Sequence, residues 1–115
     1  MYKISLLKPY LDLIKQGKKT IEGRKNSIKY HSFKEKDKIL FNYNDEECLT
    51  EIIKINKYKT IREYLENEGI EYTMPHVKSI EEGLEVFDLI YPNQIIKLLE
   101  YKYGYGFLGI HIKLV

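Results

Sequence analysis

The sequence of 115 residues has a single cysteine, no tryptophan, three prolines and three histidines. Cys48 has no partner in the chain, which excludes an intrachain disulfide framework and favours a reducing compartment. One cysteine and three scattered histidines lack the spacing of zinc ligands, so we expect no metal and no cofactor. No apolar run is long enough for a membrane span or regular enough for a signal peptide. We therefore expect a soluble, cytoplasmic protein without a membrane partner.

What remains is the composition of an ordinary globular protein, with 43% apolar and 31% charged residues. This balance argues against disorder. A chain of this length fits one domain, residues 1–115, and is long enough to bury a core without disulfides or metals.

The charge is unevenly distributed along the chain. Residues 1–40 hold 11 Lys and Arg against 4 acids, a net +7, whereas residues 41–115 hold 8 against 13, a net −5. A basic first third suits an anionic partner, and nucleic acid is the obvious one. The alternative is that lysine is simply frequent throughout this composition.

Alternating and amphipathic patterns predict the order of the main elements. We expect a strand over residues 2–7, a short helix from Pro9 that is closed by Gly17, and an extended segment over residues 20–24. A strand pair over residues 37–43 and 49–58, with a polar turn at residues 44–47, and a last strand over residues 107–115 complete the sheet. The predicted class is α+β, a small curved β-sheet or barrel with peripheral helices.

Two helix starts carry the capping-box pattern of a hydroxyl followed three residues later by glutamate, at Thr60 and at Ser79. Gly69 is expected to end the first of these helices, and the second should run to about Leu89.

The segment Gly17-Lys18-Lys19-Thr20-Ile21-Glu22-Gly23-Arg24 places cations, a carboxylate and two glycines within eight residues, directly after the first helix. Its spacing Gly-x-Lys-x-x-Glu-x-Arg resembles the signature of the ASCH family, whose members share a PUA-like β-barrel fold. The position of this segment after a first strand and a short helix also resembles the family. The resemblance implies the same small curved barrel for this chain.

The resemblance also implies a function related to RNA. ASCH domains are generally thought to bind RNA. Some small members are amidohydrolases that remove the acetyl group of N4-acetylcytidine with a Lys, a Thr and a Glu. Ribonuclease activity has been associated with other members. Lys19 matches the catalytic lysine. The threonine position is held here by Glu22, and Thr20 is the nearest hydroxyl. The family's catalytic glutamate corresponds to residues 71–82, where Glu81 is the freest candidate because Glu82 belongs to a capping box; Glu71 and His76 are alternatives.

Two interpretations stay open for the central residues. Lys19, with its pKa lowered by neighbouring cations, would act as a base or nucleophile, or it would hold a phosphate as a simple charge. Glu22 would accept an amino group of a base or act as a general base, or it would form an ion pair with Arg24 on the same strand face.

Arg24 is expected to hold an anion or to orient Glu22, because its planar fork suits phosphate and carboxylate. Further ligand contacts are predicted from the neighbouring positions Gly17, Lys18, Lys25 and Tyr30. The aromatic segments at residues 30–34 and 101–105 suit base stacking, although the second is better explained as structural. His111 is expected to be structural, and Cys48 is not expected to be a nucleophile.

Three functions are therefore considered, in this order. The first is binding of RNA or of a modified nucleoside, the second is hydrolysis of N4-acetylcytidine with Lys19, Thr20, Glu22 and Glu81 as the candidate catalytic residues, and the third is a protein-interaction adaptor with an inert pocket.

Overall fold

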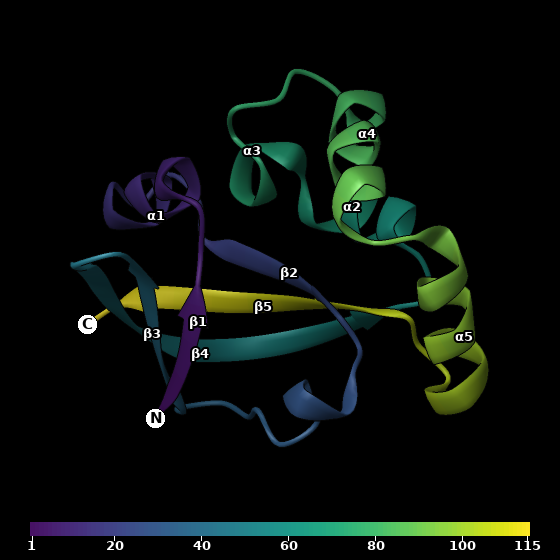
Figure 1. Ribbon diagram of the computed structural model, residues 1–115, viewed down its shortest axis with the longest axis horizontal. Coiled ribbons are helices and arrows are strands. Elements are labelled where there is room, and N and C mark those ends of the chain that lie inside the picture. Colours follow the sequence, from purple (N-terminus) through teal and green to yellow (C-terminus); the bar gives the residue numbers. More distant parts are fainter.

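A five-stranded sheet forms the centre of the computed structural model, which describes residues 1–115. The strand order is β1-β3-β4-β5-β2, in which β1 runs parallel to β3 and all other neighbours are antiparallel. The strands are β1 Tyr2–Ser5, β2 Ile21–Lys25, β3 Lys38–Tyr43, β4 Glu46–Tyr58 and β5 Phe107–Leu114. Figure 1 shows the long strands β4 and β5 crossing the molecule side by side.

The sheet is curled into a half-barrel whose two free edges are β1 and β2. A register shift in β4 between Ile52 and Lys54, opposite β5, marks a β-bulge. Bulges increase the local twist and bend a strand, which helps to curl a long hairpin. The predicted α+β class with a small curved sheet is confirmed.

The helices lie around this sheet (Figure 1), with α1 and α5 beside opposite ends of β5 in that view. Their bounds are α1 Lys8–Lys15, η1 Ile28–Tyr30, α2 Ile61–Glu68, α3 Ile70–Thr73, α4 Ile80–Ile90 and α5 Asn93–Tyr103. None of them has both the length and the apolar character required to cross a membrane.

The predicted helix ends are confirmed, with one difference in detail. The hydroxyls of Thr60 and Ser79 accept hydrogen bonds at 3.1 Å from the backbone N–H three residues later. The glutamates at these later positions bond the backbone N–H of Lys59 and Lys78, one residue before each cap. Each glutamate thus fixes the backbone of the residue that precedes the helix cap.

The predicted β-hairpin is tighter than expected. Tyr43 pairs with Glu46, so only Asn44 and Asp45 form the turn, and β4 begins three residues earlier than predicted. Asn44 takes a left-handed backbone conformation with φ of 52°, which asparagine tolerates better than most residues. The polar residues 46 and 47 continue the strand because its neighbour supplies a full ladder of partners.

The two faces of β5 pack against different parts of the molecule. Leu108, Ile110 and Ile112 join the core inside the curled sheet, which also contains residues of β1, α1 and β3. Phe107 joins a second core that covers the outer face with α2, α4 and α5. Because opposite residues of paired strands share a face, the side chains of Glu22 and Arg24, opposite Ile110 and Leu108, point to the inner face.

Candidate functional site

The charged cluster predicted from residues 17–24 is built around an edge strand. Gly17, with φ of +73°, ends α1 and turns the chain toward β2. Lys19 and Glu22 are only 5% and 6% exposed, and the Arg24 side chain is 19% exposed. Lys19 is therefore not an exposed lysine that holds a phosphate as a simple charge, because the side chain lies inside the protein.

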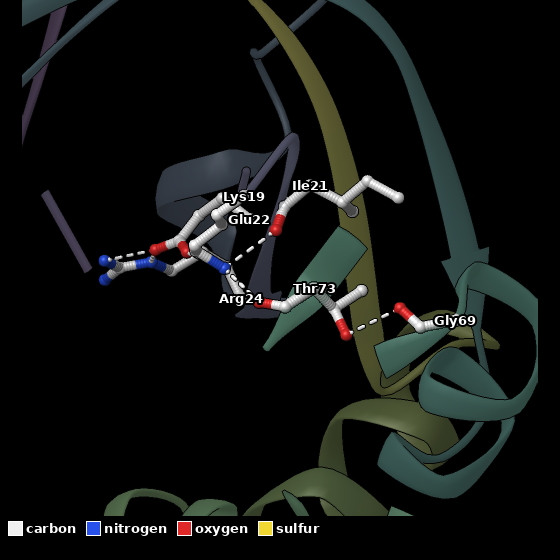
Figure 2. Close-up of polar contacts among 6 residues, drawn as sticks. All are labelled: Lys19, Ile21, Glu22, Arg24, Gly69 and Thr73. Atoms are coloured by element: carbon white, nitrogen blue, oxygen red, sulfur yellow. Dashed lines mark hydrogen bonds and ion pairs between the residues drawn. The ribbon is translucent and has the colours of Figure 1, made fainter. Parts of the chain in front are cut away.

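The ammonium group of Lys19 has three acceptors. It donates to the backbone carbonyls of Thr73 at 2.6 Å and Ile21 at 2.8 Å, and it lies 3.2 Å from Oε1 of Glu22 (Figure 2). Thr73 is itself held by a hydrogen bond from its hydroxyl to the carbonyl of Gly69 at 3.0 Å. An ammonium has three protons, so these contacts match the charged form of Lys19.

Glu22 lies between two cations. Its Oε2 accepts from Nε of Arg24 at 2.8 Å and lies 2.7 Å from Nη2, while Oε1 faces Lys19. The ion pair that we considered for Glu22 and Arg24 is thus present, with Nε and Nη2 of Arg24 both directed at one carboxylate oxygen, Oε2, while the other oxygen faces Lys19. Nη1 of Arg24 also donates to the hydroxyl of Tyr30 at 3.4 Å.

Burial and charge act against each other in this cluster. Burial lowers the pKa of Lys19, and the Glu22 carboxylate opposes part of that shift. Burial by itself would raise the pKa of Glu22, but Lys19 and Arg24 outweigh it and the net shift is downward. The pKa of Arg24 is raised because Glu22 outweighs the effect of burial. The pKa of Lys19 is lowered as predicted, but the main cause is burial rather than the neighbouring cations.

The cluster opens onto a cavity of about 260 Å³. This cavity occupies the gap between the two edge strands, since its wall includes Ser5 of β1 and residues 22–24 of β2. The remaining wall is mainly apolar and aromatic, from Leu6, Leu7, Tyr10, Met74, Val86, Phe87, Ile90 and Tyr91. A small apolar cavity with a few polar groups on one side is typical of a ligand site.

The backbone of Gly23 also faces this cavity. Hydrogen-bonded pairs alternate along an antiparallel ladder, and the N–H of Ile112 bonds the carbonyl of Thr20. In this alternation the backbone groups of Glu22 and Arg24 form hydrogen bonds to β5, whereas the backbone N–H and C=O of Gly23 point to the open edge of the sheet. The cavity therefore contains a backbone donor and acceptor as well as charged side chains.

The absence of a side chain at Gly23 has a structural cause. A Cβ atom there would lie 2.8 Å from the Tyr64 hydroxyl and 2.8 Å from the ring of Phe107, both on the outer face. Tyr64 is fully buried, and its hydroxyl has no hydrogen-bond partner. The glycine thus lets the outer core pack closely against β2.

The predicted site residues divide into three groups. Lys19, Glu22 and Arg24 line the main cavity. Lys25 and Tyr30 lie next to it, since the ammonium of Lys25 is 6.0 Å from the ring centre of Tyr91 and Tyr30 contacts Arg24. The other N-terminal candidates lie outside it: Lys18 is exposed, and Gly17 and Thr20 line a separate cavity of about 210 Å³.

The predicted second acid does not reach the cavity. Glu81 is 70% exposed and lies 3.3 Å from Arg62, and neither Glu71 nor Glu82 lines the cavity. The end of α3 instead supplies the carbonyl of Thr73 and the side chain of Met74. Glu22 is the only carboxylate in the wall. The structure shows no group of three or more His, Cys, Asp or Glu side chains able to hold a metal ion.

The aromatic wall was not foreseen from the sequence. Tyr10 lies on the helix face that turns toward the cavity, and Tyr91 directly follows α4. Burial raises the pKa of both tyrosines, so both hydroxyls stay protonated at neutral pH. No local pattern marks a side chain as part of a wall that four separate segments build together.

Comparison with known proteins agrees with the observed fold. The model of the ASCH domain matches residues 4–106. The crystal structure of hypothetical protein PH0355 is 37% identical, with a TM-score of 0.85 over 99% of this chain and 98% of that one. The solution structure of protein PF0455 from Pyrococcus furiosus is 36% identical, with a TM-score of 0.76 over 99% and 96%. No curated protein matches the chain. The family model spans most of the chain and the structural likeness spans nearly all of it, and this protein therefore belongs to the ASCH domain family.

Proposed function

We propose that this protein binds RNA or a modified nucleoside and holds one base in the cavity beside Lys19, Glu22 and Arg24. The observation that carries the proposal is a buried cluster of two cations and one carboxylate that opens onto an apolar and aromatic cavity. Such a cluster is costly to bury. Its place in the wall of a cavity, rather than in closed core, supports a role in recognition.

The shape and chemistry of the cavity fit a single base. Its volume of about 260 Å³ lies just below the roughly 300–1,000 Å³ of pockets for drug-sized ligands. Tyr10, Phe87 and Tyr91 supply flat apolar surface for a ring. The Arg24 guanidinium and the N–H of Gly23 are donors for ring nitrogens and carbonyls, and the Glu22 carboxylate and the C=O of Gly23 are acceptors for amino groups.

The test is a titration of the purified protein with cytidine, N4-acetylcytidine and the other common nucleosides, followed by calorimetry. Arg24→Lys keeps the charge but loses the planar fork. Loss of a charged hydrogen bond of about 1.5–3 kcal/mol predicts affinity weaker by roughly ten- to a hundredfold. Arg62→Lys is the matched control, because Arg62 is exposed and contacts only Glu66 and Glu81. Equal affinity of the two variants for every nucleoside would refute the proposal.

A second candidate is hydrolysis of N4-acetylcytidine at the same cavity. It is favoured by the position of Lys19 in the wall and by the lowering of its pKa through burial, since a lowered pKa makes the ammonium release a proton more readily in acid–base catalysis. In this reaction water adds to the acetyl carbon, the bond from that carbon to N4 breaks, and acetate and cytidine leave. Thr20 lies outside this cavity, so Glu22 is the remaining acid–base partner.

Chromatography of the products tests this second candidate. Lys19→Ala should abolish release of cytidine, and Lys18→Ala, which changes an exposed lysine next to it in sequence, should leave it intact. If no cytidine forms with the unmodified protein, or if Lys19→Ala releases as much as Lys18→Ala, the hydrolase interpretation is wrong while the binding proposal stands.

A further inference from the structure

A second cavity, of about 310 Å³, has no role in the site described above. Its wall comes from three distant parts of the chain: Tyr30, His31 and Phe33 in and after η1, Lys57 of β4, and Tyr103 of α5. These parts include both aromatic segments that the sequence suggested for base stacking, at residues 30–34 and 101–105. Folding brings the two segments to one place.

This second cavity lies beside the first on the inner face of the sheet. Arg24 of β2 lies opposite Leu108 of β5, and Leu108 lies opposite Lys57 of β4, so the three side chains form one row across three strands. Arg24 lines the first cavity, and Leu108 and Lys57 line the second. The contact between Nη1 of Arg24 and the Tyr30 hydroxyl, at 3.4 Å, separates the two.

The aromatic wall of the second cavity is held in place. The rings of His31 and Tyr103 meet edge to face, with centroids 4.5 Å apart. His31 Nε2 lies 3.2 Å from the backbone carbonyl of Asn26, and the buried side chain of Asn26 donates to the carbonyl of Tyr105 at 2.9 Å. These contacts tie the segment before η1 to the end of α5, so both aromatic segments are positioned without a ligand.

Four lysines near the two cavities differ from several lysines of the basic first third, which are paired with carboxylates. Lys8 and Lys15 pair with Glu46, and Lys34 and Lys38 pair with Asp37 and Glu51. Lys19 faces Glu22, but four other lysines near the cavities form no ion pair with a carboxylate, and three of these four lie over tyrosine rings; the four are Lys25, Lys29, Lys57 and Lys102. Free cations interleaved with aromatic rings are typical of surfaces that bind single-stranded nucleic acid.

We propose that the second cavity holds the base of a neighbouring nucleotide of single-stranded RNA, stacked against Tyr103 and His31, with the backbone phosphates near the four free lysines. This inference rests on the proposed function, because it assumes that the first cavity holds a base of the same strand. A strand fits better than a duplex, since both cavities take unstacked bases.

The test compares a nucleoside with a short single-stranded oligonucleotide that carries the same nucleoside, at one fixed salt concentration. The oligonucleotide should bind at least tenfold more tightly, because it adds a stacked base and phosphate contacts. Tyr103→Ala should weaken the affinity for the oligonucleotide roughly tenfold and leave the affinity for the nucleoside unchanged. Lys57→Ala should lower the slope of log affinity against log salt by about 0.7, the value for one phosphate contact on a single strand.

Lys54→Ala is the matched control, because Lys54 is an exposed lysine of the same strand that lies opposite His111 on the other face. If the nucleoside binds but the oligonucleotide gains nothing, or if Tyr103→Ala and Lys54→Ala behave alike, this inference is wrong and the proposed function stands. If the nucleoside does not bind while the affinity for the oligonucleotide depends on Tyr103, the second cavity holds a base and the proposed function is wrong.

Discussion

Glu22→Gln is the most direct test of the buried charge cluster. The substitution keeps the size of the side chain but removes the negative charge between Lys19, at 3.2 Å, and Arg24, at 2.7 Å. Two buried cations then face each other with no carboxylate between them. Removal of one partner of a buried ion pair costs about 3–5 kcal/mol, which is a large share of the roughly 5–15 kcal/mol that stabilises a typical protein.

The pH dependence of this loss has a definite sign. Burial already lowers the pKa of Lys19, and Glu22 opposes that shift, so the pKa should fall further in the variant. The unfolded chain, with a lysine pKa of 10.5, then binds more protons than the folded one, and the stability of the variant should rise with pH up to about that value. In the unmodified protein the lowered pKa of Glu22 contributes stability that is present above pH 4.5 and is lost as the pH falls below it. The Glu22→Gln variant has no carboxyl group at this position, so it should not lose this stability when the pH falls.

Urea unfolding at several pH values measures both effects. Glu81→Gln is the control, since it makes the same chemical change at a 70% exposed carboxylate whose partner is Arg62, where ion pairs contribute less than about 1 kcal/mol. If Glu22→Gln costs no more than Glu81→Gln at pH 7, or if its stability falls as the pH rises toward 10, the account of the cluster is wrong.

Three further outcomes are expected. Gly23→Ala should cost about 1–3 kcal/mol in thermal unfolding, because the new methyl group would lie 2.8 Å from the buried Tyr64; an unchanged melting temperature would contradict this. His111→Ala combined with Glu68→Gln in a double-mutant cycle should show a coupling of at least about 0.5 kcal/mol, since His111 Nε2 lies 2.7 Å from the largely buried carboxylate of Glu68; additive losses would show that the contact contributes nothing. Thr60→Ala should lower the free energy of unfolding by about 1 kcal/mol through loss of the cap of α2, and a loss below 0.3 kcal/mol would count against it.

Contacts between near neighbours in sequence were predictable. The caps at Thr60 and Ser79 and the glycines that end α1 and α2 follow from residues within four positions of each other. The family resemblance rested on eight consecutive residues, and the match over residues 4–106 confirms it. Lys19, Glu22 and Arg24 were identified for the same reason, since one turn and one strand carry all three.

The errors concern residues whose role depends on distant parts of the chain. The candidate acid Glu81 was taken from the family resemblance over residues 71–82, but α4 turns it toward Arg62 and solvent. The basic first third left open how many of its lysines face a partner, and the structure shows that Lys8 and Lys15 pair with Glu46 across the fold. A charge count along a sequence contains no information on which charges meet in space.

The sequence by itself determined the class of the fold, the ends of most elements and the three charged residues of the site, because each of these depends on short-range periodicity, capping or spacing. Only the tertiary structure decided that Lys19 is buried, since its main acceptor is the carbonyl of Thr73, 54 residues away. It also decided where the cavities lie, because curling of the sheet sets β1 against β2 and brings η1 beside α5. Curvature is a property of the whole sheet, and no single segment encodes it.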